Sequence, residues 1–397
     1  MKMKPRITLC RRLAGVLLAA SAVVIAAPAW SQGDVYKIGL ISPMSGANAR
    51  YGAFANKGAN LAVKEINAAG GVQGKKVELV SGDSQCVPAE GVSATKRMIT
   101  FDKLPIIIGD ICSSVTLAMQ PLAEESSVLL VNAASSNPAI TYKAGVGGFK
   151  WTFRNYPTDE SRAAIVLEHA VKNRGLKNFA VLSVDSDYGR GAINFTKKYL
   201  PRYPDTKILN EDYYKDSETD FRPVLSKIKN SGAQAIMMYG LADTTPIVAR
   251  QMLEMGLAGK VVLVGNAEFN TKSTIAAAPS VLNGSIEAAA WLPEWTSPRS
   301  QKFVEEYKKA YGGEMPNNHA YTHWETTHLI AAAIKAAGSF KNDDIRNALS
   351  RIKYDSAMGP VTFDDHNQAI LPMVLLEVAD SKPVIKSAIA ARIDYSK

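Results

Sequence analysis

The sequence lacks the short motifs that mark the commonest enzyme chemistries. It contains no G-x-x-x-x-G-K-[ST] segment and no strand followed by G-x-G-x-x-G, so neither a phosphate cradle nor a dinucleotide site is supported. A G-x-S-x-G nucleophile turn and an H-E-x-x-H metal-binding helix are also missing. We therefore expect no enzymatic activity and no cofactor.

Cysteine is scarce, with three residues in the whole chain. Cys10 precedes an apolar run rather than following one, so it does not have the position of a lipid-modified cysteine. Cys86 and Cys112 remain as an even pair, and such a pair in an oxidising compartment is expected to form a disulfide. A redox or metal pair is the alternative, but the sequence offers it neither C-x-x-C spacing nor a nearby histidine.

Acidic residues are absent before Asp34, where the chain is instead basic and then apolar. Five Lys and Arg residues precede an apolar run over 13–27, and small residues follow it, which is the pattern of a signal peptide. The run is shorter than the ~20 residues that span a bilayer, although an uncleaved anchor is the alternative. We predict a leader over 1–31, cleavage within 29–31 and a periplasmic location.

Loss of the leader also removes most of the excess positive charge. The five basic residues lower the formal net charge from +9 to +4. No Lys/Arg cluster remains that would track a phosphate backbone. Nucleic acid is therefore not an expected partner.

The rest of the chain alternates short apolar strands with helices. Strands are expected near 36–42, 76–81, 105–109 and 128–131, and a second series of similar size begins near 151. The length exceeds the ~250–300 residues that one core usually supports. Apolar strands between helices indicate parallel sheets covered on both faces, so we predict an α/β fold with two lobes.

Hydroxyl side chains follow two of these strands. Ser113 and Ser114 come after 105–109, and Ser135 and Ser136 come after 128–131. Ligands bind beyond the carboxyl ends of parallel strands, where helix N-termini offer N–H groups that suit a carboxylate. Ordinary helix caps and turns use the same residues, and the pattern alone leaves that alternative open.

Two other clusters have simpler explanations than chemistry. His319 and His323 could share one helix face, but two histidines do not complete a zinc site, and we expect a packed helix there. Asp185 and Asp187 could form an acid/base pair. Since they lie between a strand and a helix, we expect one of them to cap that helix.

Several segments, in order, resemble the leucine/isoleucine/valine-binding class of periplasmic binding proteins. They are 38–46 (IGLISPMSG), 65–74 (EINAAGGVQG), 108–114 (IGDICSS), Phe153 and Arg154 with Pro157 and Asp159, and 358–364 (MGPVTFD). The resemblance implies the type I fold, with three crossings at the hinge. It implies one lobe from 32–157 and 291–360, and the other from 158–290 and 361–397. Cys86 and Cys112 fall at the disulfide positions of the class.

The resemblance also implies a ligand site. Ser113 is expected to meet a carboxylate, while the backbone of Ala134 and the side chain of Ser136 hold carboxylate and amino groups. Tyr51 is expected to cover the ligand side chain, and Tyr188 to reach across from the other lobe. The sequence departs from the class at two places, and the alignment of two acidic residues, Asp243 and Glu268, is therefore uncertain. The full set of candidate ligand residues is Tyr51, Ser113, Ser114, Ala134, Ser135, Ser136, Tyr188, Asp243 and Glu268.

The departures concern the amino end of the ligand. Ala242 stands where the class has a second tyrosine, with Asp243 beside it. Glu268 is the candidate for the acid that pairs with an ammonium group, while Ala267 is the strict positional match.

The implied function is capture of a small carboxylate ligand outside the cytoplasm for an ABC importer. A branched-chain or other apolar amino acid is the first expectation, and an aromatic acid or a small amide is the alternative. The expected partner is an ABC permease in the membrane, and the expected state is a monomer. A sensory module of a receptor is the alternative from another class of protein.

Overall fold

The computed structural model describes residues 35–241, 244–390, 393 and 395. The predicted leader over 1–31 and the candidate ligand residue Asp243 lie outside these residues. Within the described part of the chain, no helix has both the length and the apolar character that a membrane crossing requires.

The first sheet consists of short apolar strands that run parallel to one another. Its order is β2-β1-β3-β4-β5. All residues of β3 and β4 are buried, as expected where helices cover both faces. The strands are β1 (Val35–Ser42), β2 (Lys76–Asp83), β3 (Ile106–Gly109), β4 (Leu129–Asn132) and β5 (Thr152–Arg154).

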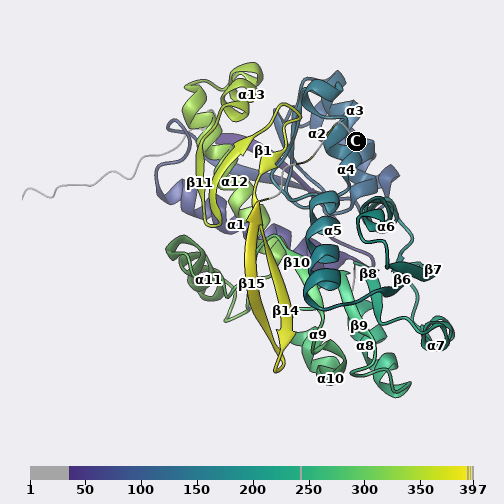
Figure 1. The fold of residues 1–397 in the computed structure, drawn as a ribbon. Coiled ribbons are helices and arrows are strands. Elements are labelled where there is room, and N and C mark those ends of the chain that lie inside the picture. Colours follow the sequence, from purple (N-terminus) through teal and green to yellow (C-terminus); the bar gives the residue numbers. More distant parts are fainter. Residues whose placement is uncertain (1–34, 242–243, 391–392, 394, 396–397) are drawn as a thin grey trace, which may run out of the picture. The chain divides into compact units, whose positions relative to one another are not determined.

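The helices of the first sheet come from both ends of the sequence. α12 lies along α1 so closely that a Cβ atom on Gly58 would overlap the backbone of Ala320, which explains a glycine inside a helix (Figure 1). Apolar side chains of α12 join those of β1, β3 and β4 in one core. The helices are α1 (Ala49–Ala68), α2 (Pro88–Thr100), α3 (Ser113–Glu125), α4 (Pro138–Tyr142), α11 (Pro298–Ala310), α12 (Asn318–Ala337) and α13 (Asn342–Ser350).

The second sheet has its own core and the order β15-β14-β10-β9-β8-β6-β7. Its strands are β6 (Asn178–Val184), β7 (Lys207–Tyr214), β8 (Ala235–Tyr239), β9 (Val262–Asn266), β10 (Ile286–Ala289), β14 (Pro372–Ala379) and β15 (Lys382–Ala390). Its helices are α5 (Asp159–Glu168), α6 (Asp187–Tyr199), α7 (Arg222–Ser231), α8 (Thr244–Glu254), α9 (Lys272–Ala277) and α10 (Pro279–Leu282). β14 and β15 are antiparallel additions that lie beside β10 as a long hairpin (Figure 1).

The chain passes between the two sheets at three places in the described residues. It leaves the first sheet after β5, returns after β10 and leaves again before β14. The last return includes a small sheet of β11 (Tyr354–Ser356), β12 (Gly359–Phe363) and β13 (Ala369–Ile370). The predicted α/β fold with two lobes is confirmed. The limits of the lobes stay a prediction, and the one placed between residues 360 and 361 falls inside β12.

One local expectation is wrong, and one strand was not predicted. The cap of α6 is Ser186, whose Oγ accepts the N–H of Gly189 at 3.4 Å, and not an aspartate. Asp185 instead accepts from Arg190 Nε at 2.5 Å, and Asp187 is already helical. The strand β15 was not predicted; its side chains alternate between exposed and half-buried, and none of them is fully buried. As an edge strand it also tolerates Pro383, which has no N–H to donate.

The predicted disulfide between Cys86 and Cys112 is confirmed. It joins the loop before α2 to the residue that precedes α3, with 5.5 Å between the Cα atoms. Cys112 is buried, and Asp110 accepts its N–H at 2.6 Å. The bridge and this hydrogen bond together fix the segment that leads into Ser113.

Candidate ligand-binding site

A cavity of about 770 Å³ opens at the carboxyl ends of strands from both sheets. Its lining follows β3 and β4 in the first sheet, and β8, β9 and β10 in the second. The first turn of α1, the loop before α12 and the turn between β14 and β15 also contribute to the wall. The volume lies within the ~300–1,000 Å³ that is usual for small-molecule sites. The position agrees with the rule that ligands bind beyond the carboxyl ends of parallel strands.

The structure brings part of the predicted ligand set together at this cavity. The predicted residues that line it are Tyr51, Ala134, Ser136, Tyr188 and Glu268. Ser113, Ser114 and Ser135 do not line it. Asp243 falls outside the described residues.

The three other serines support the loops around the cavity. Ser135 is fully buried and its Oγ donates to the carbonyl of Asp110 at 2.6 Å, which ties the end of β4 to the end of β3. Ser113 is also buried, and its Oγ accepts the N–H of Asn137 at 3.2 Å. Ser114 is half-buried on α3. Ser113 and Ser135 thus shape the segments that carry the lining residues Ile111, Ala134 and Ser136.

Ser136 is connected to a buried ion pair at the start of α5. Its Oγ donates to Asp159 Oδ2 at 2.9 Å, and Asp159 Oδ1 accepts from Arg162 Nη1 at 2.6 Å. Neither charged side chain is exposed. Burial raises the pKa of Asp159, and the neighbouring Arg162 opposes that rise. The ion pair therefore lies directly behind one wall of the cavity.

Tyr188 on α6 faces the cavity from the second sheet. Its hydroxyl lies 2.8 Å from the carbonyl oxygen of Asn266 and 3.0 Å from the Oδ1 atom of the same residue. A carbonyl oxygen only accepts, so the tyrosine donates its proton. Burial holds the pKa of Tyr188 above its usual value, and the hydroxyl therefore keeps this proton at neutral pH.

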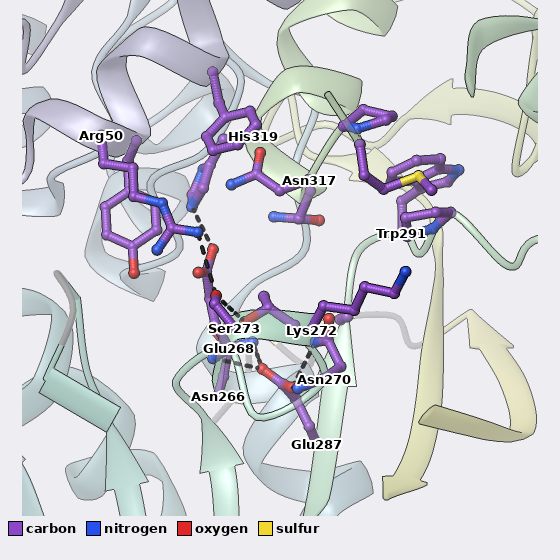
Figure 2. Close-up of a pocket in the computed structure, with 18 of the residues that line it drawn as sticks. Arg50, Asn266, Glu268, Asn270, Lys272, Ser273, Glu287, Trp291, Asn317 and His319 are labelled. Atoms are coloured by element: carbon purple, nitrogen blue, oxygen red, sulfur yellow. Dashed lines mark hydrogen bonds and ion pairs between the residues drawn. The ribbon is translucent and has the colours of Figure 1, made fainter. Parts of the chain in front are cut away.

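Glu268 projects from the loop after β9 toward α12. Its Oε1 lies 3.9 Å from His319 Nε2, and Figure 2 shows the two side chains facing each other. The backbone of Glu268 has a φ of 56°, which is unusual for residues other than glycine and asparagine. Such backbone conformations often occur at functional sites.

Glu287 on β10 holds this loop in place. Its Oε1 accepts the N–H of Glu268 at 3.0 Å and Asn266 Nδ2 at 3.1 Å. Its Oε2 accepts from Asn270 through the backbone at 3.2 Å and through Nδ2 at 2.6 Å (Figure 2). Burial raises the pKa of Glu287. Four hydrogen bonds thus constrain the unusual backbone that presents Glu268.

Two buried histidines lie at the N-terminal end of α12. Burial lowers the pKa of His319 to about 3 and that of His323 to about 4, so both are neutral near pH 7. The ring of His319 packs edge-on against Tyr51, with 5.0 Å between centroids. His319 lines the cavity, whereas His323 lies behind it and its Nδ1 contacts the carbonyl of His319 at 2.8 Å.

The remaining wall combines apolar side chains with polar and charged ones, among them Arg50, Lys57, Lys272 and Lys382. Its apolar part was not predicted from the sequence. Phe54 on α1 and Ile275 on α9 line it, together with Trp291, which follows β10 (Figure 2). Glu287 had one available signal, since it is an acidic residue inside a buried four-residue strand. His319 and Trp291 carried no signal of a site, because buried aromatic residues are ordinary core.

Comparison with known proteins agrees with this architecture. A family model described as periplasmic binding protein matches residues 35–383. The chain is 27% identical over 359 residues to the Leu/Ile/Val-binding protein homolog 1 of Brucella suis. The aligned region covers 90% of this chain and 93% of that protein. The chain belongs to the periplasmic binding protein family, and the relatives place it with the leucine/isoleucine/valine-binding class.

Solved structures show the same fold. The leucine binding protein LivK from Thermotoga maritima has a TM-score of 0.79 at 26% identity, over 89% of this chain and 98% of that one. A solute binding protein of an ABC transporter from Rhodopseudomonas palustris, in complex with 3,4-dihydroxy benzoic acid, has a TM-score of 0.82 at 24% identity, over 91% and 99%. The second likeness concerns the fold alone.

Proposed function

We propose that this periplasmic solute-binding protein captures an α-amino acid with an apolar side chain, of the branched-chain type, for an ABC importer. The direction of the hydrogen bonds around the cavity is the observation that carries the proposal. Ser136 gives its proton to Asp159, and Tyr188 gives its proton to Asn266. Both hydroxyl oxygens therefore present only lone pairs to a ligand.

Glu268 adds a carboxylate to these two acceptors. Three acceptors around one cavity suit a ligand with several donors, and an ammonium group supplies three N–H bonds. Hydrogen bonds from a charged donor to such oxygens are shorter and stronger than those between neutral groups. The same set of oxygens would repel the carboxylate of an acid that has no amino group.

The carboxylate of the amino acid is assigned to the side of the cavity formed by Ile111 and Ala134. Ile111 packs with Ala134 and directly precedes Cys112, the N-cap of α3, where the helix dipole favours negative charge. The hydroxyl of Ser113, which does not line the cavity, accepts the N–H of Asn137 and so holds the segment that carries Ala134 and Ser136 against this helix end. The apolar wall of Phe54, Ile275 and Trp291 then receives the ligand side chain.

The importer role rests on the family and on the predicted leader. Proteins of this class close two lobes around a ligand at a hinge, a motion for which periplasmic binding proteins are a standard example. Closure would exclude water and strengthen the charged hydrogen bonds. We assign a periplasmic location after removal of 1–31, a permease in the membrane as partner, and lobes joined by the three crossings.

Calorimetric titration of the protein purified from the periplasm tests the proposal. The panel contains leucine, isoleucine, valine and phenylalanine, with benzoate, 4-hydroxybenzoate, leucinamide and 4-methylpentanoate, which is leucine without its amino group. We expect binding of apolar amino acids and at least a hundredfold weaker binding of 4-methylpentanoate. Binding of the benzoates without the amino acids would refute the ligand class in favour of aromatic acids, and binding of leucinamide alone would favour an amide.

Uptake by cells separates an importer component from a sensory module. Deletion of the gene should abolish high-affinity uptake of the radiolabelled amino acid that binds in the titration. Unchanged uptake in the deletion strain, together with a lost response to the same amino acid, would instead assign the protein to a receptor.

A further inference from the structure

We propose that Asp159, held by Arg162, is a positioning residue that fixes the Ser136 hydroxyl as an acceptor and so makes the cavity select ligands with an amino group. This inference rests on the proposed function, because it assumes that an amino acid is the ligand. It concerns an ion pair that does not line the cavity and was not among the predicted ligand residues.

Two hydrogen bonds lock Ser136 to Asp159. The N–H of Asp159 donates to the carbonyl of Ser136 at 2.9 Å, and Ser136 Oγ donates to Asp159 Oδ2 at 2.9 Å. The first bond fixes the distance between the two backbones, and the second fixes the side-chain rotamer. Because an ionised carboxylate only accepts, the serine proton points away from the cavity.

Arg162 supplies a positive charge that favours the ionised form of the fully buried Asp159 and opposes the rise in pKa that burial causes. Its Nη1 lies 2.6 Å from Asp159 Oδ1, and its Nε donates to the carbonyl of Ala288 at 2.9 Å. The guanidinium also lies over the ring of Tyr156, with 5.5 Å from Cζ to the ring centroid. Tyr156 itself lines the cavity. The arginine is thus anchored to β10 while it neutralises the carboxylate at the start of α5.

The hydrogen bond to Asp159 makes the Ser136 hydroxyl selective for ligand groups that donate a hydrogen bond. A serine hydroxyl that rotates freely can donate to a ligand carboxylate or accept from a ligand ammonium. With its proton committed to Asp159, Ser136 can only accept. A ligand ammonium gains a charge-assisted hydrogen bond at this point, whereas a ligand oxygen meets a lone pair. The buried ion pair therefore acts on ligand choice through Ser136, without touching the ligand.

A double-mutant cycle with two probes tests this assignment. The dissociation constants of L-leucine and 4-methylpentanoate are measured for the unaltered protein and for Ser136→Ala, Asp159→Asn and the double variant. Ser136→Ala should weaken leucine binding about tenfold and change 4-methylpentanoate binding less than twofold, because one hydrogen bond to a charged group is lost. Asp159→Asn should lower the preference for leucine by a similar factor.

The double variant distinguishes action through Ser136 from an independent effect. If Asp159 acts through the serine, adding Asp159→Asn to Ser136→Ala should change the leucine preference no further. Ser285→Ala is the matched control, because that serine is fully buried and lies outside the cavity lining. It should alter neither dissociation constant.

Three results would overturn the inference. They are an equal loss of both probes in Ser136→Ala, additive losses of preference in the double variant, or an unchanged preference in Asp159→Asn. If Asp159→Asn does not fold, Ser136→Thr provides the second test, because a threonine hydroxyl should recover most of the leucine affinity that alanine removes. An unaltered protein that binds no amino acid would instead refute the proposed function, and the selectivity with it.

Discussion

Asp110 is a buried acid whose ionisation should limit the stability of the protein at neutral and alkaline pH. It follows β3, is fully buried and accepts the N–H of Cys112 at 2.6 Å. Burial raises its pKa from 3.8 to about 7, because the charged form loses its hydration. We expect Asp110→Asn, which preserves the shape and removes the charge, to stabilise the protein above pH 7.

The sign and size follow from proton linkage. Between pH 4 and pH 7 the folded protein keeps the Asp110 proton while the unfolded chain releases it, so stability falls as pH rises. Each pKa unit corresponds to 1.36 kcal/mol, and a rise of roughly three units therefore costs on the order of 4 kcal/mol at pH 8. Near pH 4, close to the ordinary pKa of 3.8 that the carboxyl group has in the unfolded chain, the cost falls below about 1 kcal/mol.

Urea unfolding at several pH values measures this effect. The free energy of unfolding of Asp110→Asn should exceed that of the unaltered protein by several kcal/mol at pH 8 and approach it at pH 4. Asp205→Asn is the control. Asp205 is exposed and pairs with the exposed Lys177 at 3.2 Å, so removal of its charge should change stability by less than about 0.5 kcal/mol. A destabilised Asp110→Asn at pH 8 would refute the reasoning.

Three further predictions concern the cavity and the disulfide. Glu268→Gln should weaken leucine binding about tenfold to a hundredfold and leave 4-methylpentanoate binding unchanged in calorimetry, because it removes a charge that faces the ligand ammonium; equal losses would contradict that role. Replacing both Cys86 and Cys112 by serine should lower the free energy of unfolding, measured in urea, by about 3 kcal/mol, because the bridge links residues that are 26 positions apart. An unchanged midpoint of urea unfolding would show that the bridge does not stabilise the protein. Because the pKa of His319 is lowered to about 3, leucine affinity should not follow a histidine titration between pH 5.5 and 8; a tenfold change centred near pH 6.5 that disappears in His319→Phe would contradict a neutral His319.

The fold was predictable because its pattern is carried by local sequence. Short, buried and mainly apolar strands such as β3 and β4 lie between helices. That alternation indicates parallel sheets covered on both faces, and it does not depend on the residues in the loops. β10 was missed because Glu287 interrupts its apolar character. That glutamate is tolerated in a buried strand only because Glu268, Asn266 and Asn270 satisfy its oxygens.

The sequence predicted where the ligand site lies, at the carboxyl ends of the strands, but not which side chains there face the cavity. Ser135 and Ser136 are adjacent in sequence, yet one turns inward to the carbonyl of Asp110 and the other lines the cavity. That difference depends on loop dihedrals, which residue types at a strand end do not specify. The pairing of Asp159 with Arg162 resembles an ordinary exposed helix start, and only the three-dimensional packing shows that it is buried.

The hairpin of β14 and β15 has a consequence for the time at which the second sheet can form. β10 pairs with β14, from Ile286↔Glu377 to Ala289↔Val374. The residues of β14 lie more than eighty positions later in the sequence, so they are synthesised well after β10. The first sheet, by contrast, is complete once residue 154 has emerged. A chain that appears from its N-terminus therefore carries β10 as an open edge until its final strands arrive, and such edges invite pairing with other chains. Keeping the nascent protein unfolded until it is whole removes that hazard, and delivery across a membrane as an extended chain would do so.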